Sequence, residues 1–444
     1  MLKIYTAAEA QQTILRRRPD AEETPASLQA GMQRVFGAPL TPEEGVRHIL
    51  ADVRRRGDAA LRHWTARIDG ITLDSLAIPA GTLATALNHI PADLADALQL
   101  AAARIRAFHQ HQPLPNWSTT SLGGRLGQRV TPLRRVGVYV PGGTAPLPSS
   151  LLMAVIPAQV AGVQEIVVAT PPGRGQALVH PTILAAAHIA GISTIYTLGG
   201  AQAIAALAYG SETIPPVDKI VGPGNLFVTL AKRQVFGTVG IDGLYGPTET
   251  AVIADDSANP AWVAADMLAQ AEHDVLATAI LFTPSATLAA AVQSQVAHQL
   301  EALSRADIIA TALAGQGGIV LTRDLAEAAA LADEFAAEHL CLSVADPAGL
   351  ATTIRSAGGL FLGERSFEVL GDYVAGPSHN MPTGGTARFA SPLNVFDFVR
   401  INSIIELDDA TAAQLSPIAA RIAQAEQLTA HANAATLRAK MPPG

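Results

Sequence analysis

Two adjacent residues, Glu338 and His339, carry side chains suited to proton transfer. They follow a predicted helix and directly precede the predicted strand Leu340–Val344, and the start of a strand is a rigid mount for catalytic groups. Histidine titrates near neutral pH, so it can both accept and release a proton during a reaction. The position alone does not decide this role, because the dipole at an exposed helix C-terminus also favours a protonated histidine.

Four further residues form a candidate metal site: Gln270, His273, Asp372 and His431. Gln270 and His273 are three residues apart at the C-terminal end of a helix predicted to begin near Pro260, so they share one face. Asp372 lies in a predicted loop, and His431 lies in the C-terminal tail. Nitrogen and oxygen donors of this kind suit Zn²⁺ better than the thiolate-preferring metals. Spacing alone favours the alternative that they are ordinary surface or core residues.

Three glycine-containing turns follow predicted strands. Their sequences are Tyr139-Val-Pro-Gly-Gly-Thr-Ala-Pro, Gly199-Gly-Ala-Gln202 and Gly222-Pro-Gly-Asn225. After successive strands of one parallel sheet, such turns lie along a common edge, where open α/β sheets bind ligands. The chain has no G-x-G-x-x-G fingerprint, so a standard dinucleotide fold does not follow from motifs. Tyr139, Gln202 and Asn225 are the side chains that we expect to orient a cofactor.

The elements that position these residues change in character near Arg135. The preceding part is predicted to be mostly helical, with Thr41 as the N-cap of a periodic stretch to about Trp64 and a second helix from about Ala92 to His109. Beyond Arg135, short β-branched runs alternate with alanine-rich helical runs, which is typical of βαβ units and parallel sheets. The predicted strands fall into two series, Val136–Val140, Glu165–Ala169, Thr194–Leu198 and Lys219–Val221, then Ala251–Ala254, Ala279–Phe282, Gly318–Leu321, Leu340–Val344 and Gly359–Leu362. We interpret the series as two similar α/β modules.

Composition limits the class of protein. A chain of 444 residues with 49% hydrophobic and 15% charged residues predicts a well-buried, multidomain α/β protein. The net charge of −8 gives no reason to expect nucleic acid or a membrane as partner, and Arg54–Arg56 is interpreted as a solvated helix face. The single cysteine, Cys341, fits a cytoplasmic protein, and a small core residue explains it better than a thiol nucleophile.

Taken together, these segments resemble the histidinol dehydrogenase family from about residue 30 to residue 437. The resemblance rests on six motifs in order: Val136-Gly-Val-Tyr-Val-Pro-Gly-Gly, Gly199-Gly-Ala-Gln-Ala-Ile-Ala-Ala-Leu, Lys219-Ile-Val-Gly-Pro-Gly-Asn, Gln270-Ala-Glu-His, Glu338-His-Leu and Gly371-Asp-Tyr. Their lengths, order and spacing make chance agreement negligible.

The resemblance implies a role for each matching position. Glu338 and His339 fall on the catalytic pair, and Tyr139, Gln202 and Asn225 fall on NAD-contacting positions. The implied ligands of one zinc ion per subunit are Gln270, His273, Asp372 and His431. The implied substrate-binding residues are Thr248, Gln270, His273, His339, Asp372, His379, Glu426 and His431.

The resemblance also implies an α/β fold of two incomplete Rossmann-like domains, one inserted in the other. The expected division is an N-terminal segment 1–34, a first domain of 35–138 and 250–393, an NAD-contacting second domain 139–249, and a C-terminal helical tail 394–444. The family forms a homodimer in which the tail, here with Glu426 and His431, completes the partner's site.

The implied reaction is the zinc-dependent oxidation of L-histidinol to L-histidine with two NAD⁺, the last steps of histidine biosynthesis. His339 would remove the alcohol proton, and Glu338 would activate the water that adds to the aldehyde. Tyr245 and Thr248 stand where the family commonly has Ala and Ser. Two alternatives stay open: a paralogue that oxidises another polar or amino alcohol, and a non-catalytic binding protein on the same scaffold.

Overall fold

The computed structural model describes residues 2–17, 26–142, 146–173 and 179–439. Contacts divide the chain into two compact units. Unit 1 comprises residues 1–111 and 134–398, and unit 2 comprises residues 112–133 and 399–444. Unit 1 contains two parallel sheets, and unit 2 contains one antiparallel sheet.

The larger sheet of unit 1 has six parallel strands in the order β1-β11-β10-β9-β12-β13. Their bounds are β1 Ile4–Thr6, β11 Gly317–Leu321, β10 Thr278–Thr283, β9 Glu249–Ala254, β12 His339–Ser343 and β13 Gly359–Leu362. All residues of β9, β10 and β12 are buried, as expected for central strands covered on both faces. In the register of β9 and β12, His339 lies opposite Thr250 and Leu340 opposite Ala251.

Two hydrophobic cores cover the two faces of this sheet, and alternate strand residues enter each of them. Val252 and Cys341 belong to the core shared with α11, α12 and α13, whereas Ile253 and Leu340 belong to the core shared with α1 and α14. The bounds of these helices are α11 Pro260–Ala271, α12 Ala286–Leu300, α13 Ala306–Gln316, α1 Ala7–Gln12 and α14 Leu325–Phe335. The prediction that Cys341 is a core residue is confirmed, and burial raises the pKa of its thiol well above the usual value.

The smaller sheet of unit 1 has five parallel strands in the order β6-β5-β4-β7-β8. Their bounds are β6 Ile195–Thr197, β5 Glu165–Thr170, β4 Arg135–Tyr139, β7 Lys219–Val221 and β8 Gly240–Ile241. This sheet is formed by a continuous stretch that separates β1 from the rest of the six-stranded sheet. The predicted fold class, two Rossmann-like parallel sheets with one inserted in the other, is confirmed.

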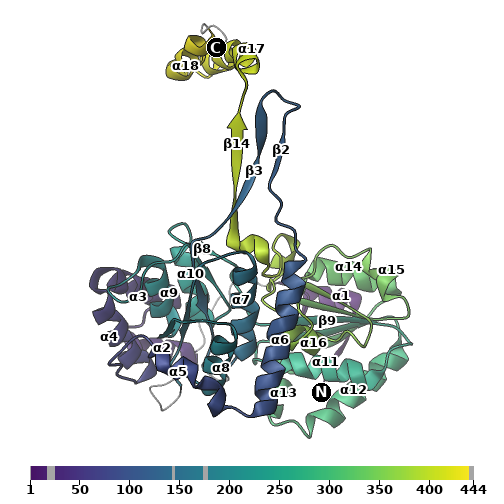
Figure 1. Ribbon diagram of the computed structural model, residues 1–444. Helices are drawn as coiled ribbons and strands as arrows, with labels where there is room; N and C mark the ends of the chain where they lie inside the picture. The colour runs from purple at the N-terminus through teal and green to yellow at the C-terminus, as the bar shows by residue number, and fades with distance from the viewer. Residues whose placement is uncertain (1, 18–25, 143–145, 174–178, 440–444) are drawn as a thin grey trace. The chain divides into compact units, whose positions relative to one another are not determined.

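Helices α3, α4, α9 and α10 share one hydrophobic core with the five-stranded sheet, and α3, α9 and α10 lie side by side (Figure 1). Their bounds are α3 Pro42–Arg56, α4 Asp58–Asp69, α9 Gly200–Tyr209 and α10 Leu226–Val235. The predicted periodic stretch to Trp64 is thus two helices, because Gly57 turns the chain at φ +51° between them. The expected domain boundaries stay a prediction, although these packing contacts join α3 and α4 to the inserted sheet.

The remaining helices of unit 1 support these layers. Helix α7 packs on β4 and contacts α6 and α8. The bounds are α2 Ala26–Phe36, α5 Ala80–Ala84, α6 Ala92–Gln110, α7 Pro148–Val160, α8 Pro181–Ile189, α15 Pro347–Ala351 and α16 Glu368–Tyr373, with 3₁₀ turns at Ala86–His89, Thr386–Arg388 and Val395–Phe398. None of the described helices is both long and apolar enough to cross a bilayer.

Unit 2 consists of a three-stranded sheet and two helices. The bounds are β2 Trp117–Thr119, β3 Arg125–Pro132, β14 Val399–Glu406, α17 Asp409–Ala425 and α18 Thr429–Ala439. Strand β3 pairs with both of its neighbours in antiparallel fashion. The predicted helical stretch at the C-terminal end is two helices, which a left-handed residue, Gln427 at φ +60°, separates.

Candidate active site

Unit 1 contains a partly open cavity of about 190 Å³ that gathers most of the predicted site residues. It is lined by Leu147, Ser149, Ser150, Pro223, Tyr245, Gly246, Thr248, Gln270, His273, Glu338, His339, Asp372, Tyr373, His379, Asn380, Met381 and Thr383. Seven of the twelve predicted site residues are among them: Thr248, Gln270, His273, Glu338, His339, Asp372 and His379. The cavity therefore joins predicted site residues that are up to 131 residues apart in the chain, from Thr248 to His379.

The Glu338 carboxylate is held at the point where β9 and β12 begin. Its Oε2 accepts a hydrogen bond from Thr248 Oγ1 at 2.6 Å and another from the Glu249 backbone N–H at 3.1 Å. Burial raises the pKa of this carboxyl, and the nearby His339 charge and the two hydrogen bonds oppose that shift. A carboxyl group in this environment can exchange a proton nearer to neutral pH than an exposed glutamate does.

His339 is the first residue of β12 and is 3% exposed. Its Nδ1 lies 3.2 Å from the Glu249 carbonyl oxygen, and its Nε2 lies 3.2 Å from Asp372 Oδ1. Both oxygens only accept hydrogen bonds, so this arrangement suits a ring that carries a proton on each nitrogen. Burial lowers the pKa of His339, but the Glu338 and Asp372 carboxylates outweigh burial and raise it.

Gln270, His273 and Asp372 face the same cavity. Two of them lie in helices, and His273 lies just after one. Gln270 is in the last turn of α11, where its Nε2 donates to Thr248 Oγ1, and His273 follows just beyond the end of that helix. Asp372 lies in the short helix α16 rather than in the predicted loop. The six-residue helix forms because Leu370 and Val374 close backbone hydrogen bonds around it.

The protonation of these side chains suits binding to a cation. Burial lowers the pKa of His273, which favours the neutral imidazole. Burial tends to raise the pKa of Asp372, but the hydrogen bond from His339 outweighs it, so the carboxylate is ionised. Neutral histidine and ionised aspartate are the forms that bind zinc.

A complete metal site is not formed by these side chains alone. Among the residues that the structure describes, no three His, Cys, Asp or Glu side chains are arranged to hold a metal ion. The predicted set needs the Gln270 amide and a residue of unit 2, His431, in addition to His273 and Asp372. The donor set fits zinc in chemistry, and its assembly stays a prediction.

His379 connects the cavity wall to α7. Its Nδ1 donates to the Asp372 carbonyl oxygen at 2.7 Å, and its Nε2 lies 3.2 Å from Ser150 Oγ. Burial lowers the pKa of His379, so the neutral ring is favoured. Because Nδ1 carries the ring proton, Nε2 accepts a hydrogen bond from the Ser150 hydroxyl group. The two hydrogen bonds hold the imidazole beside Asp372.

The three predicted cofactor residues lie outside the cavity lining, near the carboxyl ends of β4, β6 and β7. Tyr139 ends β4, and its hydroxyl oxygen accepts from the Gly200 N–H at 3.2 Å. Gln202 is fully buried in the first turn of α9, and neither of its amide atoms has a partner among the described residues. Asn225 caps α10 by accepting from the Phe227 and Val228 N–H groups. Residues 143–145 of the first glycine-containing turn lie outside the described part of the chain.

Several cavity residues gave no signal in the sequence. Ser150 lies in the first turn of α7, before an apolar run, and Met381 and Thr383 follow the last predicted strand without a motif. Glu249 is also buried at this edge, where it forms an ion pair with Arg17 and accepts from the Gly384 N–H at 3.2 Å. These residues reach the cavity only because segments that are far apart in the sequence pack together in the fold.

Tyr245, which departs from the family pattern, lines the cavity. The ammonium of Lys232 lies 4.9 Å from the centroid of its ring. Lys232 is 2% exposed, is paired with Asp242 and donates to the Gly222 carbonyl oxygen at 2.9 Å. The tyrosine therefore lines the cavity together with Pro223 of the Gly222–Asn225 turn, and the Lys232–Asp242 ion pair lies beside its ring.

The other two predicted residues, Glu426 and His431, are exposed side chains of unit 2. Glu426 follows the last residue of α17, and His431 lies in α18. Their contribution to a site stays a prediction.

Comparison with known proteins identifies the family of this chain. The family model described as histidinol dehydrogenase matches residues 40–439. The histidinol dehydrogenase of Deinococcus radiodurans is 50% identical over 442 residues, which covers 99% of this chain and 100% of that protein. That of Dehalococcoides mccartyi is 50% identical over 400 residues, 90% of this chain and 91% of that protein. The crystal structure of histidinol dehydrogenase from Elizabethkingia anophelis matches with a TM-score of 0.89 at 34% identity, covering 99% of this chain and 98% of that one.

Proposed function

The chain belongs to the histidinol dehydrogenase family, and we propose from this that it oxidises L-histidinol through L-histidinal to L-histidine, reducing two NAD⁺. The observation that carries the proposal is the buried pair Glu338 and His339, which faces one cavity with Gln270, His273 and Asp372. A binding protein has no need of a fixed acid/base pair in its cavity, so this geometry favours an enzyme.

His339 and Glu338 have separate tasks in the proposed reaction. In the first oxidation His339 takes the alcohol proton while a hydride passes to NAD⁺, which gives the aldehyde and NADH. In the second, Glu338 takes a proton from the water that adds to the aldehyde, and the resulting hydrate gives its hydride to a second NAD⁺. The Thr248 and Glu249 hydrogen bonds keep the Glu338 carboxylate in place for that step.

We assign one zinc ion per subunit to Gln270, His273, Asp372 and the tail residue His431. When bound, the zinc ion would orient the amine and imidazole of the substrate and offset the charge of Asp372, which lowers the pKa of His339 toward that of a base. The neutral His273 and ionised Asp372 support this assignment. His379 and Thr248 would complete the substrate contacts within unit 1.

NAD⁺ is assigned to the carboxyl edge of the five-stranded sheet, where Tyr139, Gln202 and Asn225 lie. The buried Gln202 amide supports this, because a buried polar group without a partner costs free energy that a ligand can recover. The boundaries of an NAD-contacting domain at 139–249 and a discontinuous first domain of 35–138 and 250–393 belong to the same proposal.

We further propose a cytoplasmic homodimer in which residues 394–444 exchange between subunits and supply Glu426 and His431 to the partner's site. Unit 2 exposes large apolar side chains that support an interface: Ile401, Ile405, Ile418, Ile422 and Leu437 are each more than half exposed. Large exposed apolar patches are typical of protein–protein interaction sites. The single buried Cys341 fits a reducing compartment.

A steady-state assay of the purified full chain with L-histidinol and NAD⁺ tests the reaction. We expect two NADH for each histidinol consumed and L-histidine as the product. One NADH per substrate, or no turnover with histidinol, would contradict the proposal. Rescue of a histidine auxotroph separates this activity from that of a paralogue, which should fail to restore growth.

A further inference from the structure

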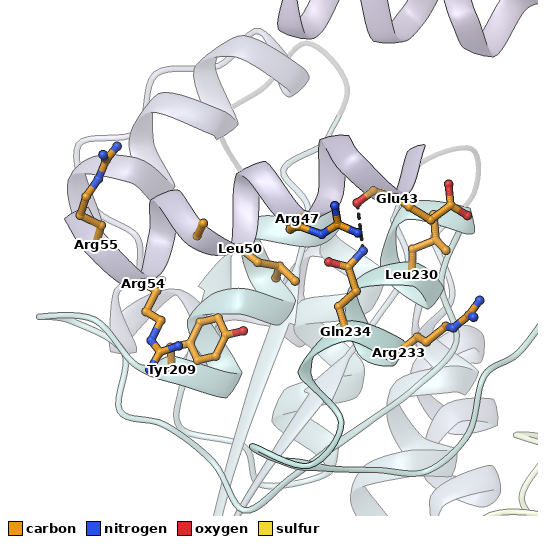
Figure 2. Close-up of a pocket in the computed structure, with 10 residues that line it drawn as sticks. Glu43, Arg47, Leu50, Arg54, Arg55, Tyr209, Leu230, Arg233 and Gln234 are labelled. Atoms are coloured by element: carbon orange, nitrogen blue, oxygen red, sulfur yellow. Dashed lines mark hydrogen bonds between the residues drawn. The ribbon is translucent and has the colours of Figure 1, made fainter. Parts of the chain in front are cut away.

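A second, larger hollow lies on the outer side of the helices that cover the five-stranded sheet (Figure 2). Its volume is about 800 Å³, and it is lined by Glu43, Arg47, Leu50, Ala51, Arg54, Arg55, Tyr209, Leu230, Arg233 and Gln234. We call this hollow the arginine groove. It belongs to neither the cavity of the acid/base pair nor the predicted cofactor residues.

The groove follows from the spacing of residues on α3. Arg47, Leu50, Ala51 and Arg54 recur at i, i+3, i+4 and i+7, so they form one stripe along the helix. Helix α10 faces this stripe with Leu230, Arg233 and Gln234, which are also three and four residues apart. The two leucines are buried and form an apolar floor, while the arginines are exposed along the rim.

The charge of the groove is unbalanced. Four arginines line it against one carboxylate, that of Glu43, in a chain whose net charge is −8. Among the described residues, Arg47, Arg54 and Arg233 form no ion pair with a carboxylate, whereas Arg55 is paired with Asp52 at 2.9 Å. Figure 2 shows Arg55 directed away from the other guanidinium groups.

An aromatic ring closes one end of the groove. Tyr209 is the last residue of α9 and is partly exposed, and the guanidinium of Arg54 lies 5.5 Å from the centroid of its ring. At the other end Gln234 Nε2 donates to the Glu43 carbonyl oxygen at 3.0 Å, which ties α10 to α3 and keeps the walls together. The groove thus combines a planar aromatic surface, an apolar floor and unpaired guanidinium groups.

We propose that the arginine groove is a binding site for a nucleoside polyphosphate that is separate from the coenzyme site. Guanidinium groups bind phosphate oxygens in a bidentate manner, and a base can stack on a tyrosine ring beside an arginine. The volume is in the range of small-molecule pockets, and the apolar floor suits the faces of a base and ribose. Arg54, which sequence analysis interpreted as part of a solvated face, becomes a ligand contact.

Isothermal titration of the full chain with ATP, in the presence of saturating NAD⁺, tests the proposal. NAD⁺ occupies the coenzyme site, so the remaining ATP binding reports the groove. We expect binding that Arg54→Gln weakens about 10-fold and that Arg54→Gln with Arg233→Gln weakens further, because each removes a charge-assisted hydrogen bond. Tyr209→Leu is expected to weaken ATP and to leave tripolyphosphate unchanged.

Arg323→Gln is the control, since it removes the same charge from an exposed side chain that does not line the groove and is paired with Glu327. It should bind ATP within about twofold of the parent chain. Thermal melting of each variant confirms that it is folded. Absence of ATP binding at millimolar concentration, loss of binding on adding NAD⁺, or equal effects of Arg54→Gln and Arg323→Gln would overturn the proposal. So would tighter binding of an acidic peptide than of ATP.

Discussion

The two parallel sheets of unit 1 meet the candidate active-site cavity through opposite ends of their strands. The six-stranded sheet contributes residues at the amino ends of β9 and β12, namely Thr248, Glu338 and His339. The five-stranded sheet contributes segments that follow the carboxyl ends of β4 and β7, such as Ser150 and Pro223. Open α/β sheets usually bind ligands at their carboxyl ends, so only the second sheet follows that rule.

The two sheet edges also differ in the kind of side chain that they hold. The six-stranded edge holds buried ionisable groups whose pKa values are shifted by burial and by one another. The predicted cofactor side chains at the five-stranded edge are neutral, namely the Tyr139 phenol and the amides of Gln202 and Asn225, and the charges of Lys232 and Asp242 beside them are paired with each other. Proton transfer requires titratable groups in rigid positions, whereas orienting a cofactor requires hydrogen bonds without competing charge. We infer that one sheet carries the chemistry and the other carries the cofactor.

Removal of metal is expected to have the largest effect on this division. Full chelation should abolish histidinol oxidation, because the substrate's orientation at the six-stranded edge depends on the cation. Activity is followed as NADH formation, and added Zn²⁺ should restore it. NAD⁺ binding, measured by titration of the chelated protein, should persist; activity without metal would break the comparison.

The substitution His339→Asn should lower kcat by about 10²–10⁴-fold, because it removes the proton acceptor at the six-stranded edge. Zinc content, measured by elemental analysis, and the affinity for NAD⁺ should stay unchanged. Cys341→Ala is the matched control, two residues along the same strand and in the core. It should retain most of kcat; an unimpaired His339→Asn enzyme would refute the role of the histidine.

Asp52→Asn tests whether a buried carboxylate beside the five-stranded sheet stabilises the fold and has no role in catalysis. The Asp52 carboxylate accepts hydrogen bonds from Trp64 Nε1 at 3.0 Å and from Arg55 and Arg56, which joins α3 to α4. The variant should lose about 2 kcal/mol in free energy of unfolding, because charged hydrogen bonds are weakened, with kcat unchanged. Denaturant unfolding and the standard assay measure the two quantities.

The same residue predicts the pH dependence of stability. The hydrogen bond from Arg56 lowers the pKa of Asp52 in the folded chain, so its contribution is present above the unfolded pKa of about 4. It is lost as pH falls through the lower folded value. The parent chain should therefore lose its stability advantage over Asp52→Asn in acid; a constant difference down to the lowest accessible pH would contradict the ion pair.

Gln202→Leu is expected to have the smallest effect and to sharpen the assignment of the cofactor. If the buried amide contacts NAD⁺, its loss raises KM for NAD⁺ about 10-fold, in line with one hydrogen bond, and leaves KM for histidinol unchanged. If the amide has no partner even when NAD⁺ is bound, replacing it with leucine should raise the melting temperature and leave the KM for NAD⁺ unchanged. Steady-state kinetics with each substrate varied distinguishes the two.

Local pattern predicted most of the secondary structure. Apart from the two-residue β8, which was not predicted, the strands from Val136 to Leu362 lie where β-branched runs indicated, because buried parallel strands are continuous apolar segments. The errors fall where tertiary contacts decide: the break at Gly57, the helix at Asp372 and the break at Gln427. Short helices and left-handed turns depend on neighbours that periodicity does not include.

The sequence by itself determined the α/β class and the family, and it predicted the acid/base and ligand residues, since these follow from local composition and long motifs. Only the tertiary structure decided that Glu338 accepts from Thr248, that Asp372 bonds His339, and that Tyr245 and Ser150 line the same cavity. It alone also brought α3 and α10 together to form the arginine groove. Contacts between residues far apart in the chain arise from strand order and helix packing, and neither is encoded in the spacing of any single segment.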